Sequence, residues 1–152
     1  MSDVKNINPK ALAATTRIPL GLVPDTIAVE VSMAYLEGAL KYGRYNWAAT
    51  QVSASTYHDA MRRHLAKWWN GENEDKKTKV KHLASIIASA GILLDAELRG
   101  TLVDDRPPIA DLDGLMEKRA AEVMTNLKEL FKDCDPYQWS IQDVFVKAPP
   151  TK

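Results

Sequence analysis

The sequence predicts an all-α protein, a bundle of at least four helices, and three observations support this. Apolar residues recur at spacings of three and four along four segments, which is the pattern of amphipathic helices. Proline or glycine stands next to the ends of several of these segments, where helices begin and end. Only residues 138–146 alternate apolar and polar side chains, and a single strand cannot form a sheet.

The four helices are expected in one domain that spans residues 1–152. Pro24 and Gly43 bound the first helix, whereas Gly71 and Gly100 are expected to cap the second and third. The predicted spans are about 25–42, from Ser53 or Ser55 to Asn70, about 80–99, and about 113–132. Around them we expect an N-terminal arm (1–24), a helical core (25–132) and an irregular C-terminal tail (133–152).

Apolar residues predict which faces of these helices are buried. The first helix is apolar on broad faces, so it is expected to be buried on most sides. In the third helix the spacing predicts a core face of large apolar residues, with His82, Ser85 and Ser89 on a different face. That predicted core face comprises Leu83, Ile86, Ile87, Ala90 and Leu94.

Composition excludes several classes of protein. Twenty basic and twenty acidic residues give no net charge, which argues against a dedicated duplex-DNA binder. The single cysteine, Cys134, allows no disulfide within the chain and favours a reducing compartment. The first residues are polar, and the apolar stretch from Leu83 to Leu94 is too short to span a membrane. We therefore expect a cytoplasmic protein without a membrane partner.

The segment GENED, residues 71–75, is a candidate metal site. Glu72 and Asp75 are three residues apart, and His82 follows seven residues later. Hard cations such as Mg²⁺ prefer carboxylate oxygens, with phosphate oxygens completing the coordination shell. The alternative interpretation of the same residues is a solvated, charged turn.

The second helix carries the segment HDAMRRH, residues 58–64. Asp59 and Arg63 lie one turn apart, as in an ordinary surface ion pair, but Arg63 could instead contact a triphosphate. His64 lies beside the apolar stripe and is interpreted either as a core histidine or as a ligand. The doublet His58-Asp59 resembles part of the site of HD-type phosphohydrolases.

The first helix and the segment that follows it supply two further candidates. Glu30, Glu37 and Lys41 share one stripe of a mostly apolar helix, so the carboxylates either face solvent or hold a cation. The segment KYGRYNW, residues 41–47, places aromatic rings beside Asn46, a combination suited to stacking on a base and contacting its edge. The alternative is a helix end with Trp47 in the core.

Three ordered segments resemble the N-terminal domain of phage-type dATP/dGTP diphosphohydrolases. They are GALKYGRYNW (38–47), RRHLAKWWNGENED (62–75) and KHLAS (81–85), and RIPLGLVP (17–24) resembles the entry segment of that family. The family is similar in outline to MazG-like all-α nucleotide pyrophosphohydrolases, which bind Mg²⁺ through an ExxE and an ExxD motif. Here Asp59 and Arg62 fall at the first motif, and His82 and Ser85 at the second.

The resemblance implies that Mg²⁺ or Mn²⁺ assists hydrolysis of a purine deoxynucleoside triphosphate to a monophosphate and pyrophosphate, which would let a phage control the dNTP pool. It implies a dimer or tetramer, because MazG-like proteins build sites between subunits. The implied metal or catalytic residues are Glu37, Asp59, Glu72, Asp75 and His82. The implied substrate-binding residues are Lys41, Tyr42, Asn46, Trp47, Arg63 and His64.

Two other functions remain open at this point. An HD-type nucleotide phosphohydrolase would use His58, Asp59, His64 and His82, and would release different products. A non-catalytic helical interaction module would keep the fold and bind no nucleotide.

Overall fold

The computed structural model describes residue 10 and residues 17–143, and these residues are mostly helical, which confirms the predicted all-α class. The predicted arm and tail therefore lie partly outside the described residues, at 1–9, 11–16 and 144–152. The chain forms two compact units, Met1–Asp104 and Asp105–Lys152, so the predicted helical core of residues 25–132 spans both. The described elements of the first unit are η2 (Leu20–Leu22), α2 (Asp25–Tyr42), α3 (Asn46–Ala49), β1 (Val52–Ser53), α4 (Ala54–Trp69), α5 (His82–Arg99) and β2 (Leu102–Val103).

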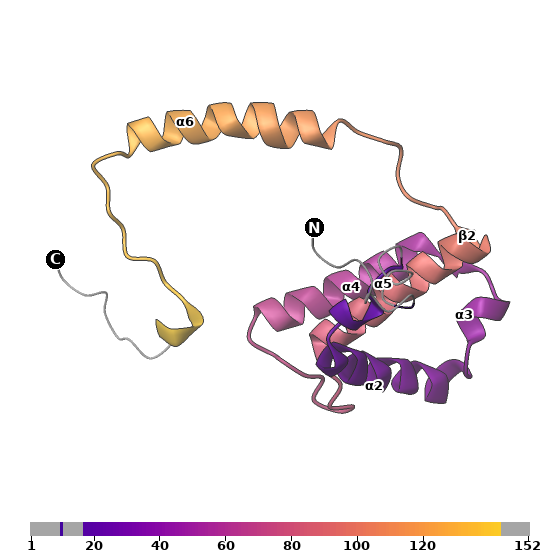
Figure 1. Ribbon diagram of the computed structural model, residues 1–152. Helices are drawn as coiled ribbons and strands as arrows, with labels where there is room; N and C mark the ends of the chain where they lie inside the picture. The colour runs from indigo at the N-terminus through magenta and orange to yellow at the C-terminus, as the bar shows by residue number, and fades with distance from the viewer. Residues whose placement is uncertain (1–9, 11–16, 144–152) are drawn as a thin grey trace, which may run out of the picture. The chain divides into compact units, whose positions relative to one another are not determined.

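Three long helices build the first unit. Helix α4 packs along α5, and α2 packs against α5 as well, so α5 contacts both of the other helices (Figure 1). The short strands β1 and β2 pair in parallel, with Val52 opposite Leu102, and thereby hold the start of α4 beside the chain that follows α5. Residues of α2, α4 and α5 line an open pocket between these helices.

The helix ends follow from the local sequence. Gly43 and Gly100 cap α2 and α5 with φ of 94° and 72°, a left-handed backbone that glycine adopts without strain. The predicted cap at Gly71 was one residue late, because Asn70 caps α4 and Gly71 follows with φ of 90°. No helix was predicted between residues 43 and 53, but the short helix α3 lies there.

Small side chains, rather than large ones, form the buried face of α5. Ala84, Ala88 and Ala96 are buried, together with the fully buried His82. The predicted core face was wrong for three of its large residues, since Leu83, Ile87 and Leu94 are 43%, 44% and 58% exposed. Alanine permits close approach of neighbouring helices, and we infer that this is why the small-residue face of α5 is the one turned inward.

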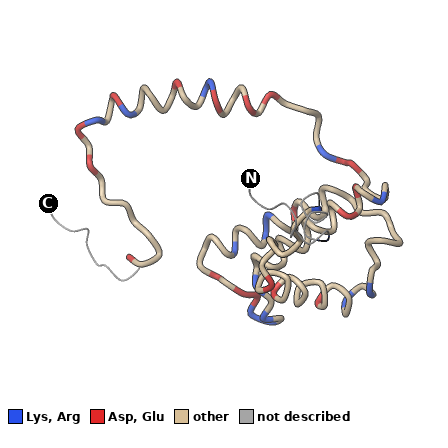
Figure 2. The backbone as a smooth tube through the Cα atoms, in the orientation of Figure 1, with Lys and Arg blue, Asp and Glu red and all other residues tan. Residues whose placement is uncertain are grey.

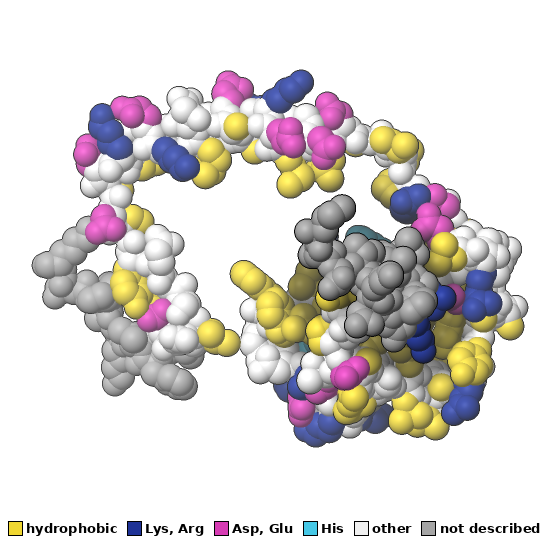
Figure 3. Space-filling view, in the orientation of Figure 1, with side chains coloured by type: hydrophobic (Ala, Val, Ile, Leu, Met, Phe, Trp, Pro, Cys, Tyr) yellow, Lys and Arg dark blue, Asp and Glu magenta, His cyan; other side chains and the backbone are white. Residues whose placement is uncertain are grey.

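The apolar surface of α2 is also more exposed than the sequence predicted. No residue of α2 is buried, and the exposed fraction of Leu40 reaches 81%. Other large apolar side chains of this helix are exposed to a lesser degree, and apolar side chains are visible on the surface of this unit (Figure 3). These side chains are Ile27, Val29, Met33 and Leu36.

The second unit contains the predicted fourth helix. Residues Gly114–Arg119 (η3) form π-helical turns, and α6 (Ala120–Leu130) continues them, while Ile141–Asp143 (η4) is a 3₁₀ turn. The Asp111 carboxylate accepts a hydrogen bond from Gly114 N at 2.8 Å and so caps the first turn. Acidic and basic residues are interspersed along this helix (Figure 2). Among the described helices of the chain, none has the length and apolar character needed to cross a bilayer.

Candidate functional site

A pocket of about 180 Å³ lies within the first unit, between α2, α4 and α5, with α3 at its edge. Aromatic and small apolar side chains form most of its wall, and one lysine, one glutamate, one asparagine, one histidine and two serines add polar groups. The lining residues are Ala34, Tyr35, Glu37, Gly38, Lys41, Tyr42, Asn46, Trp47, Tyr57, His64, Ser85, Ala88, Ser89 and Ile92.

The structure brings five of the six predicted substrate-binding residues together around this pocket. They are Lys41, Tyr42, Asn46, Trp47 and His64, which come from α2, α3 and α4. Arg63 is exposed and does not line the pocket. Successive residues of a helix are about 100° apart, so His64 and Arg63 cannot point in the same direction.

Helix α3 places Trp47 at the pocket wall. Tyr45, just before α3, has a left-handed backbone with φ of 61°, which turns the chain sharply after α2. Trp47 Nε1 donates a hydrogen bond to Asp95 Oδ2 over 3.1 Å, and its ring centroid is 5.4 Å from that of Tyr35. Arg99 Nε donates to the same Asp95 oxygen over 2.7 Å. The ring of Trp47 also contacts that of Tyr45, with centroids 5.9 Å apart, so the half-buried indole is held by three side chains.

Two residues near Trp47 were not predicted from the sequence. The first is Asp95, whose pKa is held below its usual range. The largest cause is the hydrogen bond from Arg99, and the positive charge of Arg99 and the hydrogen bond from Trp47 add to it. The carboxylate is therefore ionised and accepts both hydrogen bonds. Gly91 leaves room for the Tyr35 hydroxyl, because a Cβ at position 91 would lie 2.5 Å from that oxygen. Sequence spacing cannot reveal the contact of Trp47 with Asp95 or that of Tyr35 with Gly91, since each joins two helices that are distant along the chain.

The polar groups of the pocket differ in charge. Burial raises the pKa values of Tyr35 and Tyr57, so both phenols are neutral hydrogen-bonding groups at neutral pH. Lys41 pairs with Glu37 one helical turn away, and this hydrogen bond raises the pKa of the lysine. The pocket thus offers one ammonium group paired with one carboxylate at its α2 side.

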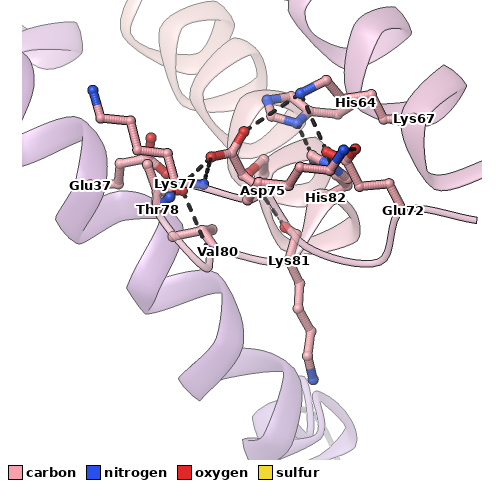
Figure 4. Close-up of polar contacts among 12 residues, drawn as sticks. Glu37, His64, Lys67, Glu72, Asp75, Lys77, Thr78, Val80, Lys81 and His82 are labelled. Carbon is pink, nitrogen blue, oxygen red and sulfur yellow. Dashed lines mark hydrogen bonds and ion pairs between the residues drawn. The ribbon is translucent and has the colours of Figure 1, made fainter.

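Next to the pocket, a cluster of charged and imidazole groups joins α4, α5 and the loop between them (Figure 4). His82 is fully buried, and its Nε2 lies 3.0 Å from Glu72 Oε1. Its Nδ1 lies 2.9 Å from Nδ1 of His64. Lys67 lies between the carboxylates of Glu72 and Asp75, with its Nζ 3.5 Å from an oxygen of each.

The GENED segment is part of an ordered loop rather than only a solvated turn. The Asp75 carboxylate accepts hydrogen bonds from the backbone N–H groups of Lys77 and Thr78, both at 3.0 Å. His82 N donates to Asn73 O over 3.1 Å, which ties the loop to the start of α5. These contacts make Asp75 a structural group of the loop, facing Lys67.

We expect Asp75 to contribute stability that depends on pH. Hydrogen bonds from the Thr78 and Lys77 backbone lower the pKa of this carboxyl from 3.8 to about 2. A depressed carboxyl pKa stabilises the folded state above the unfolded-state pKa, and this contribution is lost as pH falls from about 4 to about 2. In urea unfolding, the midpoint difference between wild type and Asp75→Asn should shrink over this window. A difference that is constant with pH would contradict this assignment.

The described residues do not fit a resident metal site. Among residues 10 and 17–143, no three His, Cys, Asp or Glu side chains are placed to hold one metal ion. Both ring nitrogens of His82 are already in hydrogen bonds, and the Lys67 ammonium is paired with Glu72 and Asp75. Of the predicted metal ligands, only Glu37 lines the pocket.

Asp59 and His58 lie away from this cluster. Their side chains are 66% and 62% exposed, and they contact each other over 3.2 Å. His58 and His64 are six residues apart on α4, which rotates them by about 240° around the helix. The structure therefore does not bring the four residues of an HD-type site together.

Fold and pocket define a helical protein whose aromatic pocket lies beside a histidine–carboxylate cluster. The chain belongs to the family described as dATP/dGTP diphosphohydrolase, N-terminal, which matches residues 7–106. The match ends close to the boundary of the first unit at Asp104 and includes every residue of the pocket and cluster. Searches of curated proteins and of solved structures gave no match to this chain.

Proposed function

We propose that this protein hydrolyses dATP or dGTP to the deoxynucleoside monophosphate and pyrophosphate. The observation that carries the proposal is the family match over residues 7–106, which contains the whole aromatic pocket. Apolar walls with a small number of placed polar groups are typical of sites for small organic ligands.

The pocket supports a particular orientation of the nucleotide. Its volume of about 180 Å³ is below the ~300–1,000 Å³ of typical small-molecule pockets, so we infer that it receives the base and that the phosphates extend beyond it. Trp47 and Tyr35 supply faces for stacking, and Asn46 supplies an amide for a base edge. Lys41, at the α2 side, is the cation best placed for the triphosphate.

A divalent cation enters this proposal as part of the substrate. Mg²⁺ binds through few carboxylates and completes its shell with phosphate oxygens and water, so a Mg²⁺ or Mn²⁺ ion would arrive bound to the triphosphate. Glu37 is the carboxylate of the pocket that would face such an ion, in competition with its partner Lys41. The chain's own residues then bind the base and orient the phosphates.

The test is a screen of all dNTPs and NTPs with Mg²⁺ or Mn²⁺, with products separated by chromatography. We expect dATP or dGTP to give monophosphate and pyrophosphate. Release of inorganic phosphate or triphosphate would instead indicate an HD-type reaction, and absence of metal-dependent nucleotide binding would indicate a non-catalytic helical module.

We also propose that the protein self-associates as a dimer or tetramer through α2. Leu36 and Leu40 of this helix are 56% and 81% exposed, and an apolar face of this kind gains stability when a second copy covers it. Sedimentation equilibrium at micromolar concentration should show a dimer or tetramer, and Leu40→Glu should shift it toward monomer. A wild-type protein that is only monomeric would contradict this proposal.

A further inference from the structure

Three side chains form a continuous hydrogen-bonded chain from the loop into the pocket. Glu72 contacts Nε2 of His82, and Nδ1 of His82 contacts Nδ1 of His64 (Figure 4). His82 is fully buried, whereas His64 also lines the pocket. Among the described residues, no group is hydrogen-bonded to Nε2 of His64. The chain therefore ends in a ring nitrogen that has no protein partner in the described structure.

The bonding fixes where the protons lie when both imidazoles are neutral. The hydrogen bond from His82 and the nearby Lys67 lower the pKa of Glu72, so its carboxylate accepts and cannot donate. His82 must then carry its proton on Nε2, which leaves Nδ1 as an acceptor. His64 must donate from Nδ1, and its Nε2 is left with a free lone pair.

We propose that Glu72, His82 and His64 form a proton relay in which Nε2 of His64 accepts a proton from the water that attacks the substrate. This rests on the proposed function and deepens it. Glu72 and His82 were predicted from the sequence as metal ligands, but their bonding to Lys67 and His64 suits them better to orient His64. In this proposal Glu72 and His82 are positioning residues, and only His64 contacts the reacting water.

The proton transfers balance along the relay. Water transfers one proton to Nε2 of His64, while the Nδ1 proton of His64 moves to Nδ1 of His82. His82 keeps its Nε2 proton, which stays hydrogen-bonded to Glu72, so the positive charge on the His82 imidazolium lies beside a carboxylate. The water oxygen bonds to the α-phosphorus, the bond from the α-phosphorus to the bridging oxygen breaks, and pyrophosphate leaves with that electron pair. The relay is restored when the Nδ1 proton of His82 returns to Nδ1 of His64 and the Nε2 proton of His64 leaves to solvent.

The tautomers can be measured directly, because the chain has only three histidines. In ¹⁵N-histidine-labelled protein without substrate at mildly alkaline pH, long-range ¹H–¹⁵N spectra distinguish the two neutral tautomers of each imidazole. We expect His82 to carry its proton on Nε2 and His64 on Nδ1. The amide of Glu72→Gln can donate or accept, so His64 should lose its exclusive Nδ1 tautomer. A neutral wild-type His64 protonated on Nε2 would overturn the relay.

Kinetics separate a relay from a merely structural network. General-base catalysis contributes about 10²–10⁴-fold, so His64→Gln should lower kcat by about 100-fold or more. Glu72→Gln should lower kcat as well, with little change in KM, because Glu72 does not line the pocket. His58→Gln, an exposed histidine on the same helix, is the matched control and should keep wild-type kcat.

The two proposals fail in different ways. Wild-type kcat in Glu72→Gln overturns the relay while leaving the hydrolase function intact. No hydrolysis of any nucleotide by the wild-type protein overturns the function and with it the catalytic use of His64. The tautomers in the substrate-free protein report on the hydrogen-bonded chain independently of that result.

Discussion

Replacing His82 with leucine lowers the free energy of unfolding by about 2–4 kcal/mol. Leucine fills much of the same space but has no polar atoms, so both neighbours of the imidazole lose their hydrogen bond. A buried polar group without a partner costs about 1–3 kcal/mol. His64 is only partly buried, and Glu72, which is 25% exposed, recovers some hydration. The loss for each group therefore lies in the lower part of that range, and the two losses together give about 2–4 kcal/mol. Urea unfolding followed by tryptophan fluorescence measures the effect.

The matched control for this experiment is His58→Leu. His58 is on α4 and its side chain is 62% exposed, and surface substitutions of this kind usually change stability by less than about 0.5 kcal/mol. Equal stability of His82→Leu and wild type would show that the buried hydrogen bonds contribute nothing to folding.

Replacing Trp47 with alanine weakens binding of dATP or dGTP by about 5–150-fold, the loss expected when one base–aromatic stacking contact is removed. The indole lines the pocket beside Tyr35 and is fixed by Asp95. A fully buried tryptophan would instead cost about 3–5 kcal/mol of stability when truncated. Because Trp47 is only half-buried, we expect a smaller loss of stability and a clear loss of affinity.

Thermal melts with and without nucleotide distinguish these outcomes. Ligand should raise the melting temperature of the wild-type protein and raise that of Trp47→Ala much less. Trp69→Ala is the control, because Trp69 is 77% exposed and does not line the pocket. A large fall in melting temperature with unchanged nucleotide affinity would assign Trp47 to the core instead.

Local signals in the sequence were sufficient to predict the long helices. The first was predicted at about 25–42, and α2 spans Asp25–Tyr42. Pro24 stops the helix from extending toward the N-terminus, and Gly43 adopts the positive φ that ends it. Helix α3 was missed, since it has four residues and depends on the left-handed Tyr45 that precedes it. The helix propensities of residues do not predict a turn that is formed by tertiary contacts.

The candidate site was only partly predictable for the same reason. The KYGRYNW segment pointed to Lys41, Asn46 and Trp47, which do line one pocket. The pairing of His64 with His82, eighteen residues apart, follows from how α4 packs on α5 and has no signature in spacing. The periodicity of α5 was also ambiguous, since large apolar and small residues each form a stripe, and the smaller stripe proved to be the buried one.

The buried alanines of α5 limit which substitutions this helix can tolerate during evolution. At Ala84 and Ala88, which are 3% and 6% exposed, a larger side chain would force apart the helices that form the pocket. At Leu83 and Ile87, which are 43% and 44% exposed, many apolar residues would serve equally well. Selection on α5 should therefore hold its smallest residues constant and let its largest ones drift, the reverse of the pattern expected for an ordinary hydrophobic core.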